Sequence, residues 1–341
     1  KNIIKLENDR NNVMARKGPL RGMFYSFLEV PSKVKYKNKS YSADLRLKGD
    51  RIIHFEERKY SSYKIDLKRK GRIFNVKKFS LMKPRARNYI HEWIFHELIG
   101  EGGLIKLKYK FIDLKINGKD EGLYVFEEGF GKILLERNKR RNGPIFSLNE
   151  EFSLNVIDFS TDIRKAKFEV YNKNYWLDQD NIKLSEIAIQ KLRDFFGDRK
   201  SLDEILDIDK WAWYFAVADI NDYFHALRYK SVKFYYNPVN GKFEPIGFDG
   251  HRMLPNYSKY ELNWNKLMLR KGPSSFEIAK SCKKLDDHYP RFIDIDENFI
   301  NQKEVSDNRF RCKRFVYKFF YNQKGKINLD CVYYYSSYYI N

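Results

Sequence analysis

The stretch VKKFSLMKPRARNYIHEWIFHELIGEGGL, residues 76–104, contains the change of period that decides the fold. Residues 76–82 are typical of a β-strand. After them, Ile90, Ile94 and Leu98 recur at four-residue spacing, which predicts a helix with one apolar face. A pair of glycines ends that pattern. The stretch therefore predicts a strand followed by a helix.

Four segments around this stretch are also typical of strands. Residues 41–48 (SYSADLRL) and 62–68 (SYKIDLK) alternate between apolar and polar positions, as half-buried strands do. The segments YKFIDLKI and GLYVFEE flank Asn117-Gly118, a strong signal for a tight hairpin turn. The order is three strands, one helix and two strands. We therefore predict a small antiparallel sheet with one helix packed on it over roughly residues 20–130.

The second half of the chain is predicted to be more helical. Residues 182–196 carry apolar side chains on one helical face, and Trp211–Ile220 is so apolar that this helix belongs in the core. The segments KSVKFYYNP and KFEPIGF surround Asn240-Gly241 and predict a second hairpin. Residues 275–341 are interpreted as surface helices followed by an aromatic tail.

Length and composition favour one folded domain with two lobes. The chain has 341 residues, of which 43% are hydrophobic and 17% aromatic, and this composition excludes general disorder. We divide it into a strand-rich part, residues 1–130, and a helical part, residues 131–341, of a single α+β domain. This order, with a hairpin that ends in Phe-Asp-Gly, is the layout of a protein kinase.

Simple counts exclude several classes of protein. Three widely spaced cysteines form neither a disulfide framework nor a Cys-x-x-Cys pair. In HEWIFH, His91 and His96 are five residues apart and not four, so a zinc-protease helix is excluded. No stretch approaches the ~18 consecutive apolar residues of a membrane span. The first residue is Lys1 and not Met, so a signal peptide or anchor upstream stays open.

The formal charge of +21 has two explanations that the sequence does not separate. A basic protein attracts anionic partners such as phosphates, nucleic acid, lipid or acidic protein. Alternatively, lysines spread among Asn, Ile and Tyr reflect a genome of low G+C content. Binding to nucleic acid is disfavoured, because no recognition helix or RNP-like motif accompanies the charge.

The stretch EPIGFDGHRM, residues 244–253, carries the first candidate for chemistry. Its apolar run ends on Asp249, and Gly250 follows. At the exit of a hairpin this carboxylate can face a cleft and bind Mg²⁺ through oxygen. An Asp-Gly pair is also ordinary turn chemistry, and a string of three residues does not decide between the two.

Five other charged residues are candidates for phosphoryl transfer. Asp219 and Asp222 lie three apart at the end of the apolar helix, where the helix dipole disfavours carboxylates, so they require a cation or a turn role. In the first part of the chain, Glu92 on the helix can hold a strand lysine. Lys78 is favoured over Lys64 for that pairing, because Lys64 lies opposite the apolar face of its strand.

Together these segments resemble the CotH-like kinases, a family related to the spore-coat protein H of spore-forming bacteria. The resemblance runs through RLKGD (46–50), KKFSLMKPRARNYIHEWIFHELIGEGGL (77–104), YKFIDLKINGKDEGLYVFEE (109–128) and HALRYKSVKFYYNPVNGKFEPIGFDG (225–250). It implies an atypical two-lobed protein-kinase-like fold. It also implies ATP with Mg²⁺ or Mn²⁺ as cofactors, and Ser or Thr of an unidentified protein substrate as the acceptor.

The resemblance implies roles for individual residues as well. Asp249 falls on the metal-binding aspartate, and either Asp219 or Asp222 falls on the catalytic aspartate. Glu127 and Glu128 fall near the adenine edge of the nucleotide site.

Two departures from the family leave a second function open. Ser231 stands where the family has an asparagine that can help to hold metal, and a serine oxygen is a weaker Mg²⁺ ligand. A Gly-rich phosphate loop is also absent from the first 60 residues. The alternative is an inactive kinase-fold protein that acts in binding or in assembly of the cell envelope or coat. The compartment stays open between the bacterial cytoplasm and the cell envelope.

Overall fold

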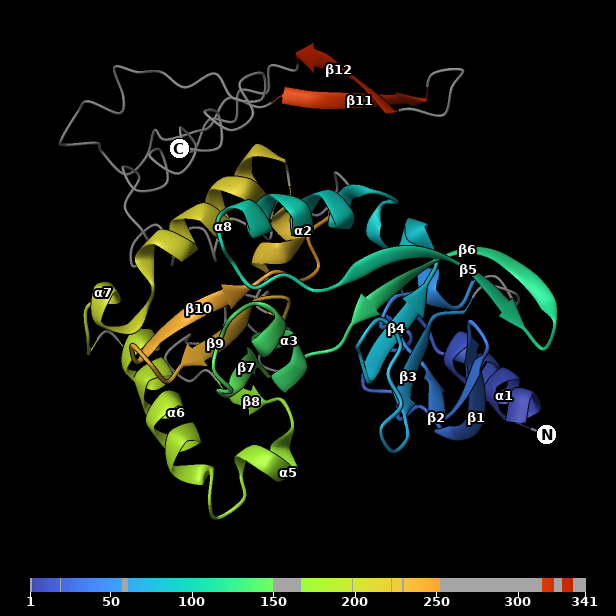
Figure 1. Cartoon of the computed structure of the whole chain (residues 1–341), viewed down its shortest axis with the longest axis horizontal. Helices are drawn as coiled ribbons and strands as arrows, with labels where there is room; N and C mark the ends of the chain where they lie inside the picture. The colour runs from blue at the N-terminus through green and yellow to red at the C-terminus, as the bar shows by residue number, and fades with distance from the viewer. Residues whose placement is uncertain are drawn as a thin grey trace. The chain divides into compact units, whose positions relative to one another are not determined.

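The computed structural model describes residues 2–18, 20–56, 61–149, 167–197, 199–221, 223–228, 230–251, 315–321 and 327–333. Its elements form two units that are discontinuous in sequence (Figure 1). The first unit holds Lys1–Trp93 and Leu107–Arg137, and the second holds Ile94–Lys106 and Asn138–Asn341. Helix α2 (His91–Glu101) therefore starts in the first unit and ends in the second.

An antiparallel sheet of six strands dominates the first unit, in the order β1-β2-β3-β4-β6-β5. The strands are β1 (Val30–Tyr36), β2 (Lys39–Leu47), β3 (Tyr63–Leu67), β4 (Lys78–Met82), β5 (Tyr109–Ile116) and β6 (Lys119–Glu128). The predicted strands are confirmed, and both turn residues of Asn117-Gly118 have positive φ. Strand β1 is additional. It lies at an edge of the sheet, where Pro31 is tolerated.

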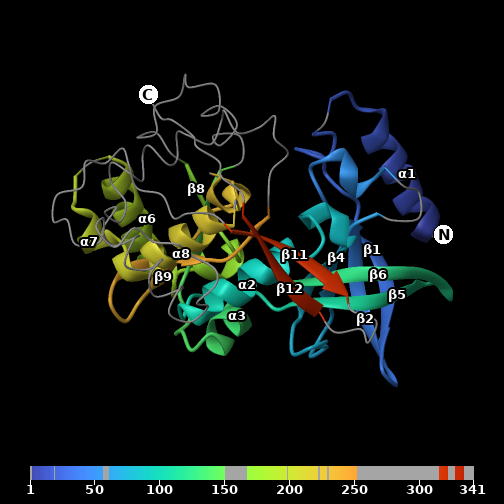
Figure 2. The same cartoon turned by 90° about the horizontal axis from the view of Figure 1, so that it is seen from above.

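Short helices accompany this sheet. They are α1 (Asn2–Ala15), the 3₁₀ turns η1 (Ile52–His54) and η2 (Pro84–Arg87), the start of α2, and α3 (Lys132–Arg137). Helix α1 packs against β1 and β2, and Figures 1 and 2 both draw it beside the sheet. The sequence predicted only α2, because residues 7–12 in the middle of α1 are all polar and interrupt any helical repeat of apolar residues. Antiparallel strands and helices together confirm the α+β class.

The two faces of the six-stranded sheet differ in polarity. The core on one face consists of Ala43, Ile65, Leu67, Phe79, Leu81, Tyr124 and Phe126. Lys64 lies across from Ser80, and Ser80 lies across from Glu127, so these three side chains share the other face. The start of α2 covers part of that face, where Trp93 packs beside Met82.

The second unit combines helices with an antiparallel sheet of four strands, in the order β10-β9-β7-β8. The strands are β7 (Ile145–Leu148), β8 (Phe168–Val170), β9 (Lys233–Asn237) and β10 (Lys242–Ile246). The predicted hairpin β9-β10 is confirmed, but the prediction of a mainly helical second part is corrected by this sheet. Strands β7 and β8 are too short for a clear alternation, and short apolar runs do not distinguish strand from helix.

The helices of the second unit pack around a core that centres on α8. They are α5 (Lys173–Trp176), α6 (Ile182–Phe196), α7 (Leu202–Ile205), α8 (Ile208–Ile220) and the 3₁₀ turn η5 (Phe224–Leu227). Helix α8 is central, as predicted: the indole N–H of buried Trp211 donates to the carbonyl of Phe243 at 3.0 Å. The hydroxyl of Tyr214 donates to the carbonyl of Ala226 at 3.0 Å. Helix α8 thereby fixes both β10 and η5.

A separate pair of strands lies near the end of the chain. Strands β11 (Phe315–Tyr321) and β12 (Ile327–Tyr333) are antiparallel. The prediction of surface helices is wrong for these two segments, whose aromatic and β-branched residues favour strands. The rest of residues 275–341 lies outside the described residues.

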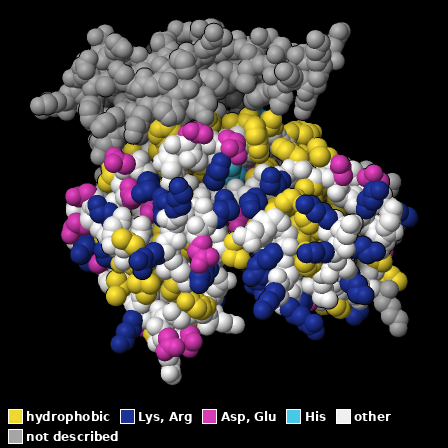
Figure 3. All heavy atoms as spheres, in the orientation of Figure 1, with side chains coloured by type: hydrophobic (Ala, Val, Ile, Leu, Met, Phe, Trp, Pro, Cys, Tyr) yellow, Lys and Arg dark blue, Asp and Glu magenta, His cyan; other side chains and the backbone are white. Residues whose placement is uncertain are grey.

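The surface charge and the length of the helices test two predictions made from composition: an anionic partner and the lack of a membrane span. Lysine and arginine side chains are spread over the face drawn in Figure 3, with acidic and apolar side chains among them. That distribution agrees with either explanation of the net charge. Among the residues described, no helix has both the length and the apolar character that a membrane crossing requires.

Candidate metal centre and ion-pair network

The loop after β10 holds Asp249 in one conformation. Its φ is +62°, in the left-handed region, which among non-glycine residues is adopted mainly by Asn and Asp. The loop lies so close to α2 that a Cβ at Gly250 would be 1.9 Å from Cδ1 of Phe95. A Cβ at Gly247 would be 1.9 Å from Cδ1 of Ile99. Contact with α2 therefore requires both glycines, and it keeps the loop in place.

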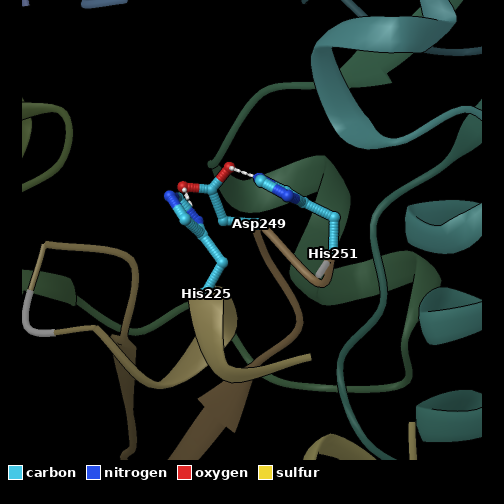
Figure 4. Close-up of side chains that lie close together, drawn as sticks. All are labelled: His225, Asp249 and His251. Carbon is cyan, nitrogen blue, oxygen red and sulfur yellow. Dashed lines mark ion pairs between the residues drawn. The ribbon is translucent and has the colours of Figure 1, made fainter. Parts of the chain in front are cut away.

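Two histidines, drawn in Figure 4, and a serine surround the Asp249 carboxylate. Nδ1 of His225 lies 3.1 Å from Oδ2 of Asp249, and Nε2 of His251 lies 3.8 Å from Oδ1. The Ser231 hydroxyl donates to Oδ2 at 2.8 Å. The two imidazole rings stack with their centroids 4.2 Å apart. All four side chains are buried, so this is an interior polar cluster.

Three elements bring this cluster together. His225 lies in η5, which α8 holds through the bond to Ala226. Ser231 precedes β9, and its backbone N–H donates to the carbonyl of Arg228 at 2.8 Å. In the hairpin, Lys233 of β9 pairs with Ile246 of β10, so Ser231 and Asp249 leave the sheet at the same end.

The donor atoms decide which cation this cluster fits. One ligand atom from each of His225, Asp249 and His251 lies within 4.8 Å of the other two. Mg²⁺ requires a nearly octahedral set of oxygen ligands, and the cluster offers one carboxylate and one hydroxyl. Imidazole nitrogen suits Zn²⁺, Cu²⁺, Fe²⁺ and Ni²⁺. Among the described residues, the cluster therefore offers Mg²⁺ one carboxylate and one hydroxyl, and its two imidazoles suit a transition metal.

Of the residues that the sequence assigned to this site, Ser231 and Asp249 come together. The backbone of Asp219 lies in the last turn of α8, and its side chain is not described. Asp222 lies outside the described residues. The choice between these two as the catalytic aspartate stays a prediction.

A second polar cluster lies in the first unit, and we call it the ion-pair network: Lys48, Arg87, Glu92 and Glu127. Nζ of Lys48 lies 2.6 Å from Oε1 of Glu127 and donates to Oγ of Ser80 at 2.9 Å. Nε of Arg87 lies 3.0 Å from Oε2 of Glu92, and Nη2 of Arg87 lies 3.7 Å from Oε2 of Glu127. Both carboxylates are buried. The network therefore links Lys48, the residue after β2, to the helix glutamate Glu92 through Glu127 and Arg87.

Lys78, which was expected to pair with Glu92, is instead at the surface. Its ammonium lies 3.1 Å from Asp66, and about half of its side chain is exposed. The strand register pairs Lys78 with Asp66 and Lys64 with Ser80, so both lysines lie on the face that carries Glu127. The argument that ranked Lys78 above Lys64 by strand face is therefore wrong.

Lys64 has an altered acidity. Loss of hydration among its neighbours, together with the charges of Arg46, Lys48 and Lys78, lowers the pKa of Lys64 to about 8. Its side chain still reaches the surface. Several cations therefore crowd one area of this face.

Glu127 and Glu128 have different surroundings, because neighbouring strand residues face opposite ways. Glu127 belongs to the ion-pair network. The carboxylate of Glu128 accepts a hydrogen bond from the backbone N–H of Lys108 at 2.9 Å and pairs with Arg137. Glu128 thus connects the residue before β5, Lys108, to α3, which follows β6.

The sequence interpretation missed Lys48, Arg87, His225 and His251. Lys48 continues the alternation of β2, and it lies within the RLKGD stretch. His251 follows Asp249 by two residues. His225 is far from both in the sequence, so no fixed metal-ligand spacing indicated that they meet.

The chain is similar to known proteins over the region that contains these residues. The family described as CotH kinase protein matches residues 45–310. Inner spore coat protein H of Bacillus subtilis (strain 168) is 24% identical to the chain over 272 residues, which cover 75% of this chain and 73% of that protein. The family match includes all the residues of the ion-pair network and of the His–Asp–His cluster.

Proposed function

Because the chain belongs to the CotH kinase protein family, we propose that it is an atypical protein kinase. It binds ATP and transfers the γ-phosphate to Ser or Thr side chains of a protein. In this proposal the two units correspond to the two lobes of a kinase, and Asp219 or Asp222 acts at the acceptor hydroxyl.

The ion-pair network is the observation that carries the proposal. Phosphoryl transfer depends on a lysine that contacts the phosphates and an acid that positions this lysine. Lys48 is 21% exposed while Glu127 is 3% exposed, so the acid is anchored and the ammonium can reach a ligand. Arg87 and Glu92 hold the acid from the other side. Lys48 therefore takes the role that the sequence assigned to Lys78 or Lys64.

The cations near Lys48 support binding of a polyanion. Arg46, Lys48 and Lys78 all lower the pKa of Lys64, which means that their charges repel the charge of Lys64. A triphosphate placed on this face would relieve that repulsion. Adenine contacts near Glu127 remain part of the proposal.

Transfer of radiolabelled γ-phosphate, measured with thermal melts, tests the function. We expect ATP with Mg²⁺ or Mn²⁺ at 100 times its dissociation constant to stabilise the wild type by about 2.7 kcal/mol. Lys48→Met should lose both this stabilisation and transfer. Lys33→Met, at an exposed position of edge strand β1, is the matched control and should keep both. Equal loss in both variants would refute the role of Lys48.

A second candidate is a protein of the spore coat or cell envelope without transferase activity. The Ser231 hydroxyl bonded to Asp249, with two imidazoles around the carboxylate, is an unusual setting for a Mg²⁺ ligand and favours it. The name of the inner spore coat relative suggests the same location. If the folded wild type transfers no phosphate with Mg²⁺, Mn²⁺ or Zn²⁺ and any protein acceptor, this candidate replaces the kinase.

A further inference from the structure

The His–Asp–His cluster has the composition of a transition-metal site. We propose that His225, Asp249 and His251 bind one divalent transition-metal ion of the zinc class, in preference to Mg²⁺. The proposal rests on the proposed function only in that both use Asp249. Metal binding itself needs neither ATP nor transfer.

The distances suit coordination. Ligands about 2.1 Å from a tetrahedral zinc lie about 3.4 Å from one another. The His225 nitrogen lies 3.1 Å and the His251 nitrogen 3.8 Å from the carboxylate oxygens of Asp249, on either side of that value. Figure 4 shows both rings turned towards the carboxylate. The two rings are stacked at an interplanar angle of 24°, so one imidazole has to rotate about its side-chain bonds before all three donors face one ion.

The donor types select the class of metal. Two imidazoles and one carboxylate are a ligand set of catalytic zinc sites and of non-haem Fe²⁺ sites. Mg²⁺ gains little from imidazole and keeps oxygen ligands and water. Three protein ligands also leave a position open, where a water or a substrate oxygen can bind.

The surroundings resemble those of built metal sites. Ligating carboxylates usually accept a further hydrogen bond that orients them, and the Ser231 hydroxyl supplies one to Asp249 at 2.8 Å. Contact of Gly247 and Gly250 with α2 fixes the loop that carries Asp249 and His251. One buried cation lies on the adjacent strand: Lys233 points to the Phe248 ring, 5.1 Å from its centroid, and donates to the carbonyl of Lys230.

Metal content and affinity test this proposal on the full chain. After metal removal by chelation, we expect the protein to take up one Zn²⁺ per chain and to bind it at least 100-fold more tightly than Mg²⁺. His225→Asn and His251→Asn should each weaken Zn²⁺ binding at least tenfold. His54→Asn is the matched control, because His54 is another buried histidine, bonded to Ser62 in the first unit. It should leave Zn²⁺ affinity unchanged.

Visible absorption of the Co²⁺-loaded wild type gives a readout that does not depend on the variants folding. Four-coordinate Co²⁺ at a zinc-type site should absorb intensely, and this absorption should disappear when one equivalent of Zn²⁺ is added. Weak absorption of six-coordinate Co²⁺, binding of Mg²⁺ as tight as Zn²⁺, or no retained metal would overturn the proposal. In the last case the histidines only hydrogen-bond to Asp249.

The outcomes separate the metal from the activity. Zn²⁺ binding without phosphate transfer would remove the kinase and leave the metal site. Transfer supported by Mg²⁺, with no tight Zn²⁺ site, would remove this inference and leave the kinase.

Discussion

The ion-pair network of the first unit and the His–Asp–His cluster of the second unit are both largely buried, and they are built differently. The ion-pair network of the first unit has two cations and two carboxylates at distances of 2.6 to 3.7 Å. Its charges balance within the chain. The His–Asp–His cluster has one carboxylate and two groups that are neutral unless protonated. The first arrangement is suited to positioning one lysine, and the second is suited to accepting an additional cation.

The largest expected effect is on phosphate transfer and tests whether the His–Asp–His cluster takes part in the reaction. Asp249→Asn should reduce γ-phosphate transfer at least ~1,000-fold, equivalent to ~4 kcal/mol in the barrier. Asparagine keeps the shape and tolerates a φ of +62°, so the melting temperature should change little. Transfer assays and melts with Asp113→Asn, an exposed control on β5, complete the comparison. Retention of most activity by Asp249→Asn would assign the loop to turn structure alone.

The next effect should appear in stability. Glu127→Gln leaves the cations of Lys48 and Arg87 without their shared carboxylate, so we expect unfolding in urea to cost ~3 kcal/mol less. Glu97→Gln is the control, because Glu97 pairs with Lys106 at the surface, and its loss should change the stability by less than ~1 kcal/mol. Similar values for the two variants would show that the ion-pair network does not stabilise the first unit.

A steric change sharpens the comparison for the second unit. Gly250→Ala places a Cβ against Phe95, and overpacking of this kind costs ~2 kcal/mol. The double variant with Phe95→Leu should recover part of the loss, which a double-mutant cycle in urea measures. Strict additivity of the two changes would mean that the loop and α2 do not constrain each other.

The smallest expected effect depends on pH and belongs to the first unit. The pKa of Lys64 is lowered to about 8, below its value in the unfolded chain, so its charge destabilises the folded state below pH 8. Stability from this residue should rise as the pH increases from about 8 to about 10.5. At pH 7, Lys64→Met should therefore stabilise the protein, by ~0.5 kcal/mol or less because the side chain is exposed to solvent. Thermal melts at pH 7 and pH 10 with Lys33→Met as control check the sign.

The first unit was predicted well because its strands alternate and its turns are marked. Residues 41–48 and 62–68 have a period of two, and Asn117-Gly118 fixes the hairpin between β5 and β6. Strand β7 has four consecutive buried residues and β8 has only three residues. Neither carries a periodic signal, and their pairing joins distant parts of the chain. The sequence therefore predicted the hairpin β9-β10 of the four-stranded sheet but not β7 and β8.

The candidate site divides along similar lines. Asp249 and Ser231 were assigned to one site through the resemblance to the CotH-like kinases, and a hairpin with a clear turn connects their positions. His225 joins them only through the packing of η5 on α8, which depends on tertiary structure. Arg87 was missed because the prediction required a lysine as the direct partner of Glu92. In the structure Arg87 takes that place, and Lys48 is connected to it only through Glu127. Pairings through a third group leave no fixed spacing in a sequence.

The two edge strands of the six-stranded sheet carry features that favour solubility of the protein at high concentration. An exposed strand edge can pair with another chain and start aggregation, and charged side chains or proline prevent this. Edge strand β1 carries Pro31, Lys33 and Lys35, and the opposite edge strand β5 carries Lys110 and Lys115, all exposed. Part of the net charge of +21 thus discourages intermolecular strand pairing during folding and storage.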